Sequence, residues 1–161
     1  MVDGTEDIRN MINKIYHIAD VHIRNVKRHK EYRQVFRRLY SYIKKTKQEN
    51  DLIYIAGDIV HAKTDMSPEL VDLTSEFFTN LADLLPTIVI LGNHDCNLNN
   101  NYRLDALSPI VKAIKHKNLH YLKDNGVYDI QGVHFNVMAV DEKPIKYIKA
   151  NDFEGDYKIA L

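Results

Sequence analysis

The sequence predicts an α/β fold built on a parallel sheet. Three short apolar runs of five or six residues alternate with longer segments whose apolar residues recur at intervals of three and four. Two of those longer segments open with Ser-Pro, a pair that often starts a helix. Strands and helices in alternation favour parallel strands joined by right-handed crossovers. The expected order is therefore β-α-β-α-β-α, followed by further strands.

The first β-α-β unit occupies the N-terminal third of the chain. A buried strand is expected at 14–19, where a short apolar run ends in polar residues. A long amphipathic helix follows from Val26 to Ile43, because its apolar residues form one stripe and its polar face is basic. The second strand is expected at 52–56 and is stopped by Gly57.

The remaining elements follow the same alternation. Ser67-Pro68 starts the second helix and Pro86 ends it, and a β-branched strand is expected at 87–91. Ser108-Pro109 starts a third, short helix. Further strands are expected at 119–122, 127–130, 133–140 and 157–161, with a turn at 124–126.

Composition limits the class of protein. A chain of 161 residues, 45% of them apolar, suits one domain with a substantial core. No apolar run approaches the roughly 20 residues that span a bilayer, which excludes a membrane protein. The single Cys96 cannot form an internal disulfide, and residues 1–10 lack the pattern of a secretory signal. We therefore expect an intracellular protein.

The formal net charge of zero conceals a segregation of charge. Residues 24–48 carry ten cations against Glu31, and residues 50–110 carry nine acids against Lys63 and Arg103. Such runs are usually solvated helix faces. The functional alternative is that the basic segment binds a polyanion while some of the acids hold cations. The candidate nucleic-acid contacts are Arg24, Lys27 and Arg28.

Polar residues follow each of the first three predicted strands. They are Asp20-Val21-His22, Gly57-Asp58 and Gly92-Asn93-His94-Asp95, with 38 residues from Asp20 to Asp58 and 35 from Asp58 to Asn93. In open α/β sheets, ligands bind outside the carboxyl ends of the strands, so these side chains should share one edge. Asp20 and His22 can hold one ion, and the two oxygens of Asp58 can bridge two.

These donors suit a pair of divalent cations. Asp, Asn and His without thiolate favour manganese, iron or zinc over calcium but do not choose among the three, and manganese is the metal we expect. Two ions about 3.5 to 4 Å apart would clamp a phosphate and activate water for in-line displacement. His94 is placed to touch the phosphate or protonate the leaving oxygen, and Asp95 to orient its ring.

Together these motifs resemble the signature of the calcineurin-like metallophosphoesterases, which fold as a two-sheet α/β sandwich around a dinuclear metal centre. The sequence is most similar to the SbcD-type exonuclease subunit of double-strand-break repair, and also to versions encoded by large DNA viruses. That similarity rests on residues 17–24, 56–61, 67–69 and 91–95. It covers 14–161 and leaves 1–13 as an N-terminal extension.

The resemblance implies a role for each site residue. Asp20, His22 and Asp58 would bind the first ion, and Asp58 with Asn93 the second. His94 would be the catalytic histidine. His61 matches a histidine near the phosphate, with an ordinary loop residue as the alternative. We expect no metal ligand among His17, His29, His116, His120 and His134.

The family completes its centre with three further histidines, two of them in a Gly-His-x-His motif. This sequence has no His-x-His and no histidine after His134. We therefore expect an incomplete N-terminal portion of the domain over 14–161, whether truncated, proteolysed or encoded by a shortened gene. Weak metal binding and self-association, as a homodimer, through uncovered strands such as 135–140 and 159–161 are the expected consequences.

The leading hypothesis is a metal-dependent nuclease acting on DNA, impaired in this chain. A phosphoesterase for small molecules or phosphoproteins is one alternative, since the motifs fix the chemistry and leave the substrate open. A non-catalytic module that dimerises or docks on a partner is another. In the nuclease family, that partner is a coiled-coil ATPase of the SbcC type.

Overall fold

The computed structural model describes residues 12–100, 102–143, 146–152 and 158–161. Its main sheet is four-stranded and parallel, in the order β1-β2-β3-β4. The strands are β1 (Ile15–Ile18), β2 (Leu52–Ile55), β3 (Thr87–Val89) and β4 (Leu119–Tyr121). The predicted α/β fold with a parallel sheet is confirmed.

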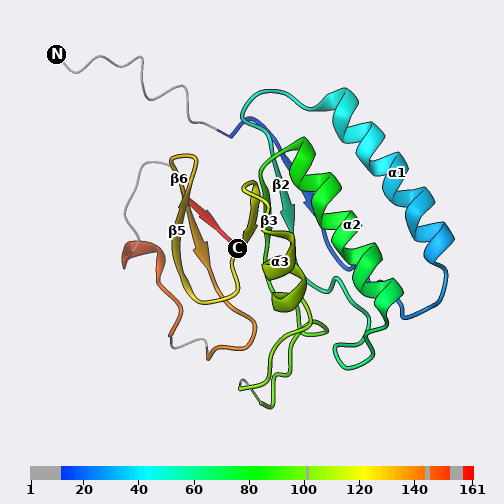
Figure 1. Ribbon diagram of the computed structural model, residues 1–161. Helices are drawn as coiled ribbons and strands as arrows, with labels where there is room; N and C mark the ends of the chain where they lie inside the picture. Colours follow the sequence, from blue (N-terminus) through cyan, green and yellow to red (C-terminus); the bar gives the residue numbers. More distant parts are fainter. Residues whose placement is uncertain (1–11, 101, 144–145, 153–157) are drawn as a thin grey trace.

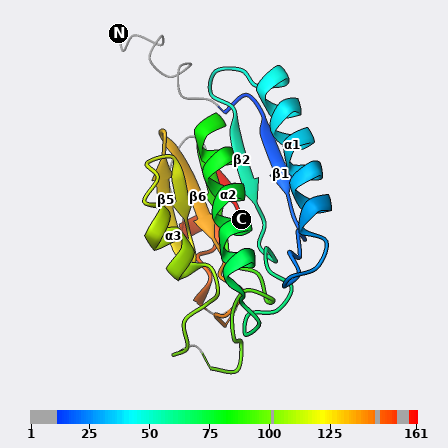
Figure 2. The same ribbon diagram turned by 45° about the vertical axis from the view of Figure 1, so that its right-hand side comes forward.

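Three helices connect these strands and cover one face of the sheet (Figures 1 and 2). They are α1 (His29–Thr46), α2 (Pro68–Leu84) and α3 (Ser108–Ile114). Helix α2 begins as its Ser-Pro pair predicts, because the Ser67 side chain accepts a hydrogen bond from the Leu70 amide. None of the described helices is long and apolar enough to cross a membrane.

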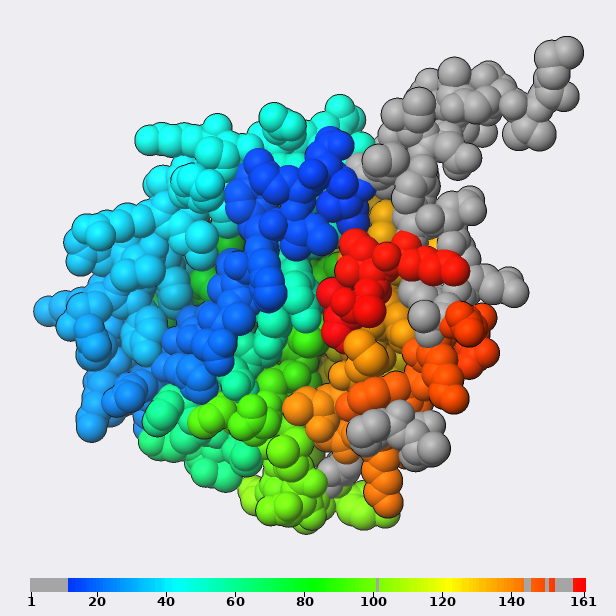
Figure 3. Space-filling model, turned by 180° about the vertical axis from the view of Figure 1, so that it is seen from behind, coloured from blue at the N-terminus to red at the C-terminus, as the bar shows by residue number. Residues whose placement is uncertain are grey.

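A second, three-stranded sheet packs against the other face. It contains β5 (Gly126–Ile130), β6 (Val133–Val137) and β7 (Lys158–Ala160), with a 3₁₀ helix, η3 (Ala150–Asp152), before β7. Strands β5 and β6 pair antiparallel, and β6 and β7 pair parallel. Seen from behind, β1 and β7 both lie at the surface (Figure 3).

Side chains that alternate along the central strand divide the interior into two cores. Ile53 and Ile55 pack with the helices, whereas Leu52 and Tyr54 pack with the second sheet. This period of two is expected of a strand covered on both faces. The strand is therefore held rigidly at the centre of the molecule, and its carboxyl end is a fixed platform for the loop that follows.

Two predicted boundaries are wrong by three residues. The first helix begins at His29 rather than Val26, because Val26 and Arg28 adopt positive φ angles of 41° and 60° that no α-helix accommodates. The strand predicted at 133–140 ends at Val137. The predicted N-terminal extension, 1–13, lies mostly outside the described residues.

The expectation of uncovered strands holds only in part. Phe135 and Val137 are buried in the core between the sheets. Met138 and Val140, just beyond the end of β6, are exposed. Strand β5, the antiparallel partner of β6, and the main sheet cover most of the apolar surface of β6 that the sequence suggested would be exposed.

Candidate metal centre

The three loops that carry the sequence motifs meet at the carboxyl edge of the main sheet, at the bottom of Figure 1. The loop after β1 is tied to the loop after β2 by main-chain hydrogen bonds. The His22 amide donates to the Asp58 carbonyl oxygen at 2.9 Å, and the Ile23 amide to that of Ile59 at 2.8 Å. An isolated parallel bridge, Ile23 to Val60, continues the pairing beyond the strands. The first two motifs are therefore fixed relative to each other by backbone.

Two glycines let the second and third motifs approach closely. A Cβ atom added to Gly92 would overlap the Asp58 amide nitrogen and one of its carboxylate oxygens. A Cβ atom on Gly57, whose φ is +76°, would lie 2.5 Å from the Gly92 nitrogen. No side chain fits in either place, so both positions require glycine. The close approach lets Asp58 Oδ1 accept a 2.8 Å hydrogen bond from the His94 amide.

Three predicted ligands have strained backbones. Asp20, His22 and Asp58 adopt φ angles of 54°, 48° and 53°. Such left-handed conformations cost of the order of 1 kcal/mol or more for residues other than glycine. They persist when surrounding contacts over-determine them, and they concentrate at functional sites. The strain here falls on residues that the sequence assigns to metal binding.

Asp20, His22 and Asp58 form a compact group of metal-binding atoms. One ligand atom from each lies within 4.8 Å of the other two, and a carboxylate oxygen of Asp20 is 3.6 Å from Nε2 of His22. Nδ1 of His22 is buried and has no hydrogen-bond partner among the described residues. A buried nitrogen without a partner is costly. Carboxylate oxygens and neutral imidazole are ligands of divalent cations, so this donor set fits one.

A second group contains three histidines. His22, His61 and His94 also place one nitrogen each within 4.8 Å of one another. The rings of His22 and His94 meet edge to face with centroids 4.6 Å apart. Nδ1 of His94 lies 2.9 Å from the carbonyl oxygen of His61, which can only accept, so the proton is on Nδ1. Nε2 of His94 is left for a ligand or a substrate.

Asp95 does not orient the His94 ring as the sequence suggested. It is fully buried, and its Oδ1 accepts from the amides of Ile59 and Val60 at 2.9 and 3.0 Å. Its Oδ2 accepts from the Gly92 amide at 3.0 Å. Burial raises the pKa of Asp95 to about 6, and hydrogen bonds from Val60 and Gly92 oppose that shift. Asp95 therefore joins the second and third motifs through their backbones.

The comparisons with known proteins agree with this geometry. Residues 13–156 match the family described as calcineurin-like phosphoesterase. The chain belongs to this family. It is also 48% identical over 139 residues to a protein of Acanthamoeba polyphaga mimivirus named uncharacterized protein R555. That match covers 85% of this chain and 10% of the viral protein, so the chain spans about a tenth of its relative's length.

Membership of the calcineurin-like phosphoesterases points to phosphoester hydrolysis as the chemistry of the family. Asp20, His22, Asp58, Asn93 and His94 lie in the loops at the carboxyl edge of the main sheet. Asn93 is exposed on the same loop as His94, and its carbonyl oxygen lies 3.2 Å from the ammonium group of Lys63. The histidines predicted not to be ligands are in neither group of potential ligands among the described residues.

Sequence reasoning missed two residues beside this site. Lys63 brings a positive charge to the loop of the third motif through its contact with Asn93. The hydroxyl of Tyr32 donates to the His22 carbonyl oxygen at 2.7 Å and so holds the strained main chain of that residue. Lys63 could have been found as one of only two cations in the acidic segment. The role of Tyr32 depends on how α1 packs, which no local pattern reveals.

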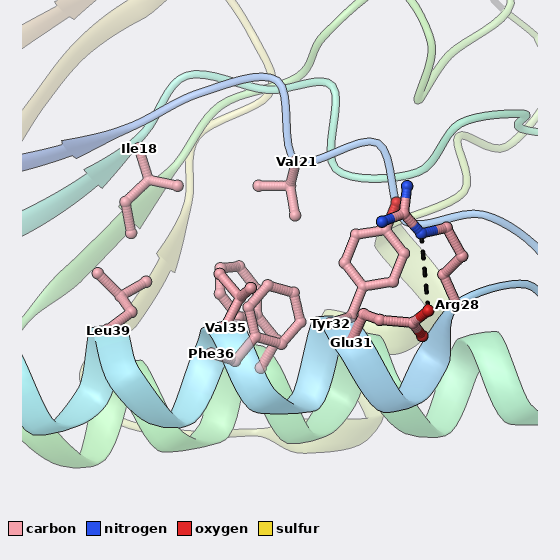
Figure 4. Close-up of a pocket in the computed structure, with 9 residues that line it drawn as sticks. Ile18, Val21, Arg28, Glu31, Tyr32, Val35, Phe36 and Leu39 are labelled. Atoms are coloured by element: carbon pink, nitrogen blue, oxygen red, sulfur yellow. Dashed lines mark ion pairs between the residues drawn. The ribbon is translucent and has the colours of Figure 1, made fainter.

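A largely apolar pocket of about 340 Å³ lies between α1 and the loop after β1. Val21, between the two predicted ligands of that loop, points into it (Figure 4). Arg28 and Glu31 form an exposed 3.9 Å ion pair there. Surface pairs of this kind contribute little, so Arg28 is free to exchange Glu31 for another anion.

Proposed function

We propose that this calcineurin-like phosphoesterase is a nuclease that hydrolyses phosphodiester bonds of DNA, as SbcD-type exonuclease subunits do. The observation that carries the proposal is the position of three cations. Arg24, Lys27 and Arg28 belong to the loop that carries Asp20 and His22, and all three are exposed. A phosphate backbone bound by these cations would therefore pass along the edge of the sheet that holds the metal-binding groups.

The rest of the basic segment supports this proposal less. Helix α1 starts at the edge that carries the site and ends at the opposite edge, before β2 begins. Its last cations accordingly lie far along the helix, where the Lys47 ammonium donates to the Leu84 carbonyl oxygen at the end of α2. Arg33 is held by Glu76 and Asp72 of α2 at 2.9 Å each. The proposed DNA contact is therefore limited to the start of the basic segment.

The proposed ligands are Asp20, His22 and Asp58 for one ion and Asp58 with Asn93 for the other. Manganese is the proposed metal, because carboxylate and amide oxygens outnumber imidazoles in this set. When bound, the ions would polarise the phosphate, neutralise its charge and lower the pKa of a water molecule.

The chain's own residues carry the remaining chemistry in this proposal. Water attacks phosphorus and releases one proton to the solvent, the bond from phosphorus to the leaving oxygen breaks, and that oxygen takes a proton from Nε2 of His94 in its imidazolium form. The hydrogen bond from Nδ1 of His94 to the His61 carbonyl oxygen keeps the ring oriented for this transfer. The His61 side chain, exposed beside it, and the Lys63 ammonium group are placed to contact the phosphate oxygens.

Binding of duplex DNA as a function of salt tests the substrate class. The variant Arg24→Gln/Lys27→Gln/Arg28→Gln should bind more weakly and show a smaller salt slope, by about 0.9 for each phosphate that is no longer neutralised. The matched control is Arg38→Gln/Lys44→Gln/Lys45→Gln, which removes three exposed cations farther along α1. Equal effects in the two variants, or no effect in either, would contradict the proposal.

Hydrolysis separates DNA from the alternative substrates. A linear duplex and a generic chromogenic phosphodiester should both be cleaved with Mn²⁺, the duplex more efficiently. Cleavage of the small ester alone would identify a phosphoesterase for small molecules. An SbcC-type ATPase partner remains a prediction that follows from the resemblance to the SbcD-type subunit, and the homodimer remains one that follows from the strands expected to be uncovered.

A further inference from the structure

We propose that His22, His61 and His94 form a second metal site that binds a single Zn²⁺ ion and competes with the carboxylate site for His22. Each histidine follows a different strand of the main sheet, and one nitrogen of each lies within 4.8 Å of the other two. Asp20, His22 and Asp58 meet the same criterion. His22 is therefore common to a group of three imidazoles and to a group with two carboxylates.

The spacing suits a tetrahedral ion after small side-chain rotations. Zn–N bonds of about 2.0–2.1 Å at tetrahedral angles put ligand nitrogens about 3.4 Å apart. Because the nitrogens lie within 4.8 Å of one another, each pair needs to approach by at most about 1.4 Å. His61 is exposed, so its side chain can rotate without disturbing a packed core. Three imidazoles leave the fourth position of the ion to water.

One of the three rings already has a suitable nitrogen without its proton, and a second has a buried nitrogen that no hydrogen bond among the described residues occupies. Because Nδ1 of His94 donates to the His61 carbonyl oxygen, its Nε2 carries the lone pair in the neutral ring. A metal-binding histidine typically makes this kind of hydrogen bond through its other nitrogen. Nδ1 of His22 is buried without a hydrogen-bond partner among the described residues.

Competition follows from the chemistry of His22. A neutral imidazole has one nitrogen with a free lone pair, so His22 serves one ion at a time. Imidazole groups suit zinc, whereas carboxylate and amide oxygens suit manganese. Divalent zinc also binds a given site more tightly than manganese. Zn²⁺ should therefore occupy the histidine group and displace Mn²⁺ from His22.

The inhibitory consequence rests on the proposed function, but binding does not. Zn²⁺ at this site would take Nε2 of His94, which is the proposed proton donor, and would displace Mn²⁺ from one of its ligands. Zinc should then inhibit the manganese-dependent hydrolysis of phosphodiesters.

Calorimetric titration of the whole chain with Zn²⁺ alone and Mn²⁺ alone tests the assignment. His61→Ala removes a ligand of the histidine group only, and Asp58→Asn removes a ligand of the carboxylate group only. His61→Ala should weaken Zn²⁺ binding by more than about tenfold, since even changes outside the ligand shell cost that much. His61→Ala should leave Mn²⁺ binding unchanged. Asp58→Asn should weaken Mn²⁺ binding and leave Zn²⁺ binding unchanged. His17→Gln, an exposed histidine on β1, is the matched control.

A spectroscopic readout keeps the test independent of activity. Pulsed EPR of the chain loaded with Cu²⁺ counts coordinated imidazoles, and should find three in the wild type and two in His61→Ala. Zn²⁺ affinity that is unchanged in His61→Ala, or that falls as much in Asp58→Asn, would overturn the second site. If the titrations succeed while DNA and other phosphodiesters are not cleaved, the proposed function fails and the zinc site stands.

Discussion

His94 donates a hydrogen bond from Nδ1 to the carbonyl oxygen of His61, 2.9 Å away. This contact joins the loop after β2 to the loop after β3. It keeps a proton on Nδ1 of the His94 ring and leaves the lone pair of the neutral ring on Nε2. The proposed proton donor is therefore oriented by main chain and needs no carboxylate partner.

Replacing His94 with alanine should lower kcat for phosphodiester hydrolysis by about 10²- to 10⁴-fold, the usual contribution of a general acid. The change in KM should be small, because the proposed role is in the transition state. Steady-state kinetics with Mn²⁺ and a chromogenic phosphodiester measure both parameters. The control, His17→Gln, should retain wild-type rates, and a His94→Ala variant that also retained them would remove the assigned role.

Replacing Asp95 with alanine should destabilise the fold by about 3 kcal/mol or more, because three buried amides lose their hydrogen-bond acceptor. Asp95→Asn, which keeps one acceptor oxygen, should cost less. The free energy of unfolding in urea measures both. Asp124→Ala, at an exposed turn position, should stay within about 0.5 kcal/mol of wild type. A similarly small effect of Asp95→Ala would show that Asp95 does not join the two loops.

Replacing Gly92 with alanine adds only one methyl group but should disrupt the metal site. The new methyl group would overlap the Asp58 amide nitrogen and carboxylate, so the two loops must separate. We expect Mn²⁺ affinity to fall at least about tenfold. The far-UV circular dichroism should stay near that of wild type, because the overlap is confined to the two loops. Wild-type Mn²⁺ affinity in this variant would mean that the loops can adjust freely.

The stabilising effect of the ionised Asp105 carboxylate should appear in the pH dependence of the free energy of unfolding. Burial alone would raise the pKa of Asp105, but hydrogen bonds from Ser108 and Tyr121 outweigh it and hold the pKa below its usual value. A depressed folded-state pKa stabilises the fold above the unfolded pKa of about 3.9, and that stabilisation is lost as the pH falls through the folded value.

Asp105→Asn should therefore cost about 2 kcal/mol near neutral pH, the range for hydrogen bonds to a charged group. The difference from wild type should shrink as the pH falls below about 4. Urea unfolding at a series of pH values measures it. A difference that stayed constant down to the acid transition would contradict the role of the ionised carboxylate.

Most of the fold follows from local patterns. The alternation of apolar runs with amphipathic segments predicted every strand of the main sheet, because a strand buried on both faces needs a continuous apolar run. Ser67-Pro68 placed the start of α2 correctly, since a cap and a proline act locally. The start of α1 was misplaced because Val26 suits an apolar stripe, while the positive φ angles before His29 depend on how the loop meets the site.

The grouping of the candidate ligands was predictable from the sequence, but the contacts around them were not. Parallel strands bring their carboxyl ends together, which explains why Asp20, His22 and Asp58 could be grouped from sequence. The role of Asp95 could not be predicted from the sequence. Its partners are the main-chain amides of Ile59, Val60 and Gly92, and nearly every residue has such an amide. The contact of Lys63 with the Asn93 carbonyl oxygen has no sequence signal either, because every residue has a carbonyl oxygen.

The central claim is that Asp20, His22 and Asp58 bind a divalent metal ion at the carboxyl edge of the sheet. Titration of the whole chain with Mn²⁺, followed by the EPR signal of the free ion, tests it most directly. We predict weak but saturable binding that falls by more than about tenfold in Asp58→Asn. Binding should be unchanged in Asp129→Asn, which alters an exposed carboxylate of β5. Equal Mn²⁺ affinity in the wild type and Asp58→Asn, or no saturable binding in the wild type, would contradict the account.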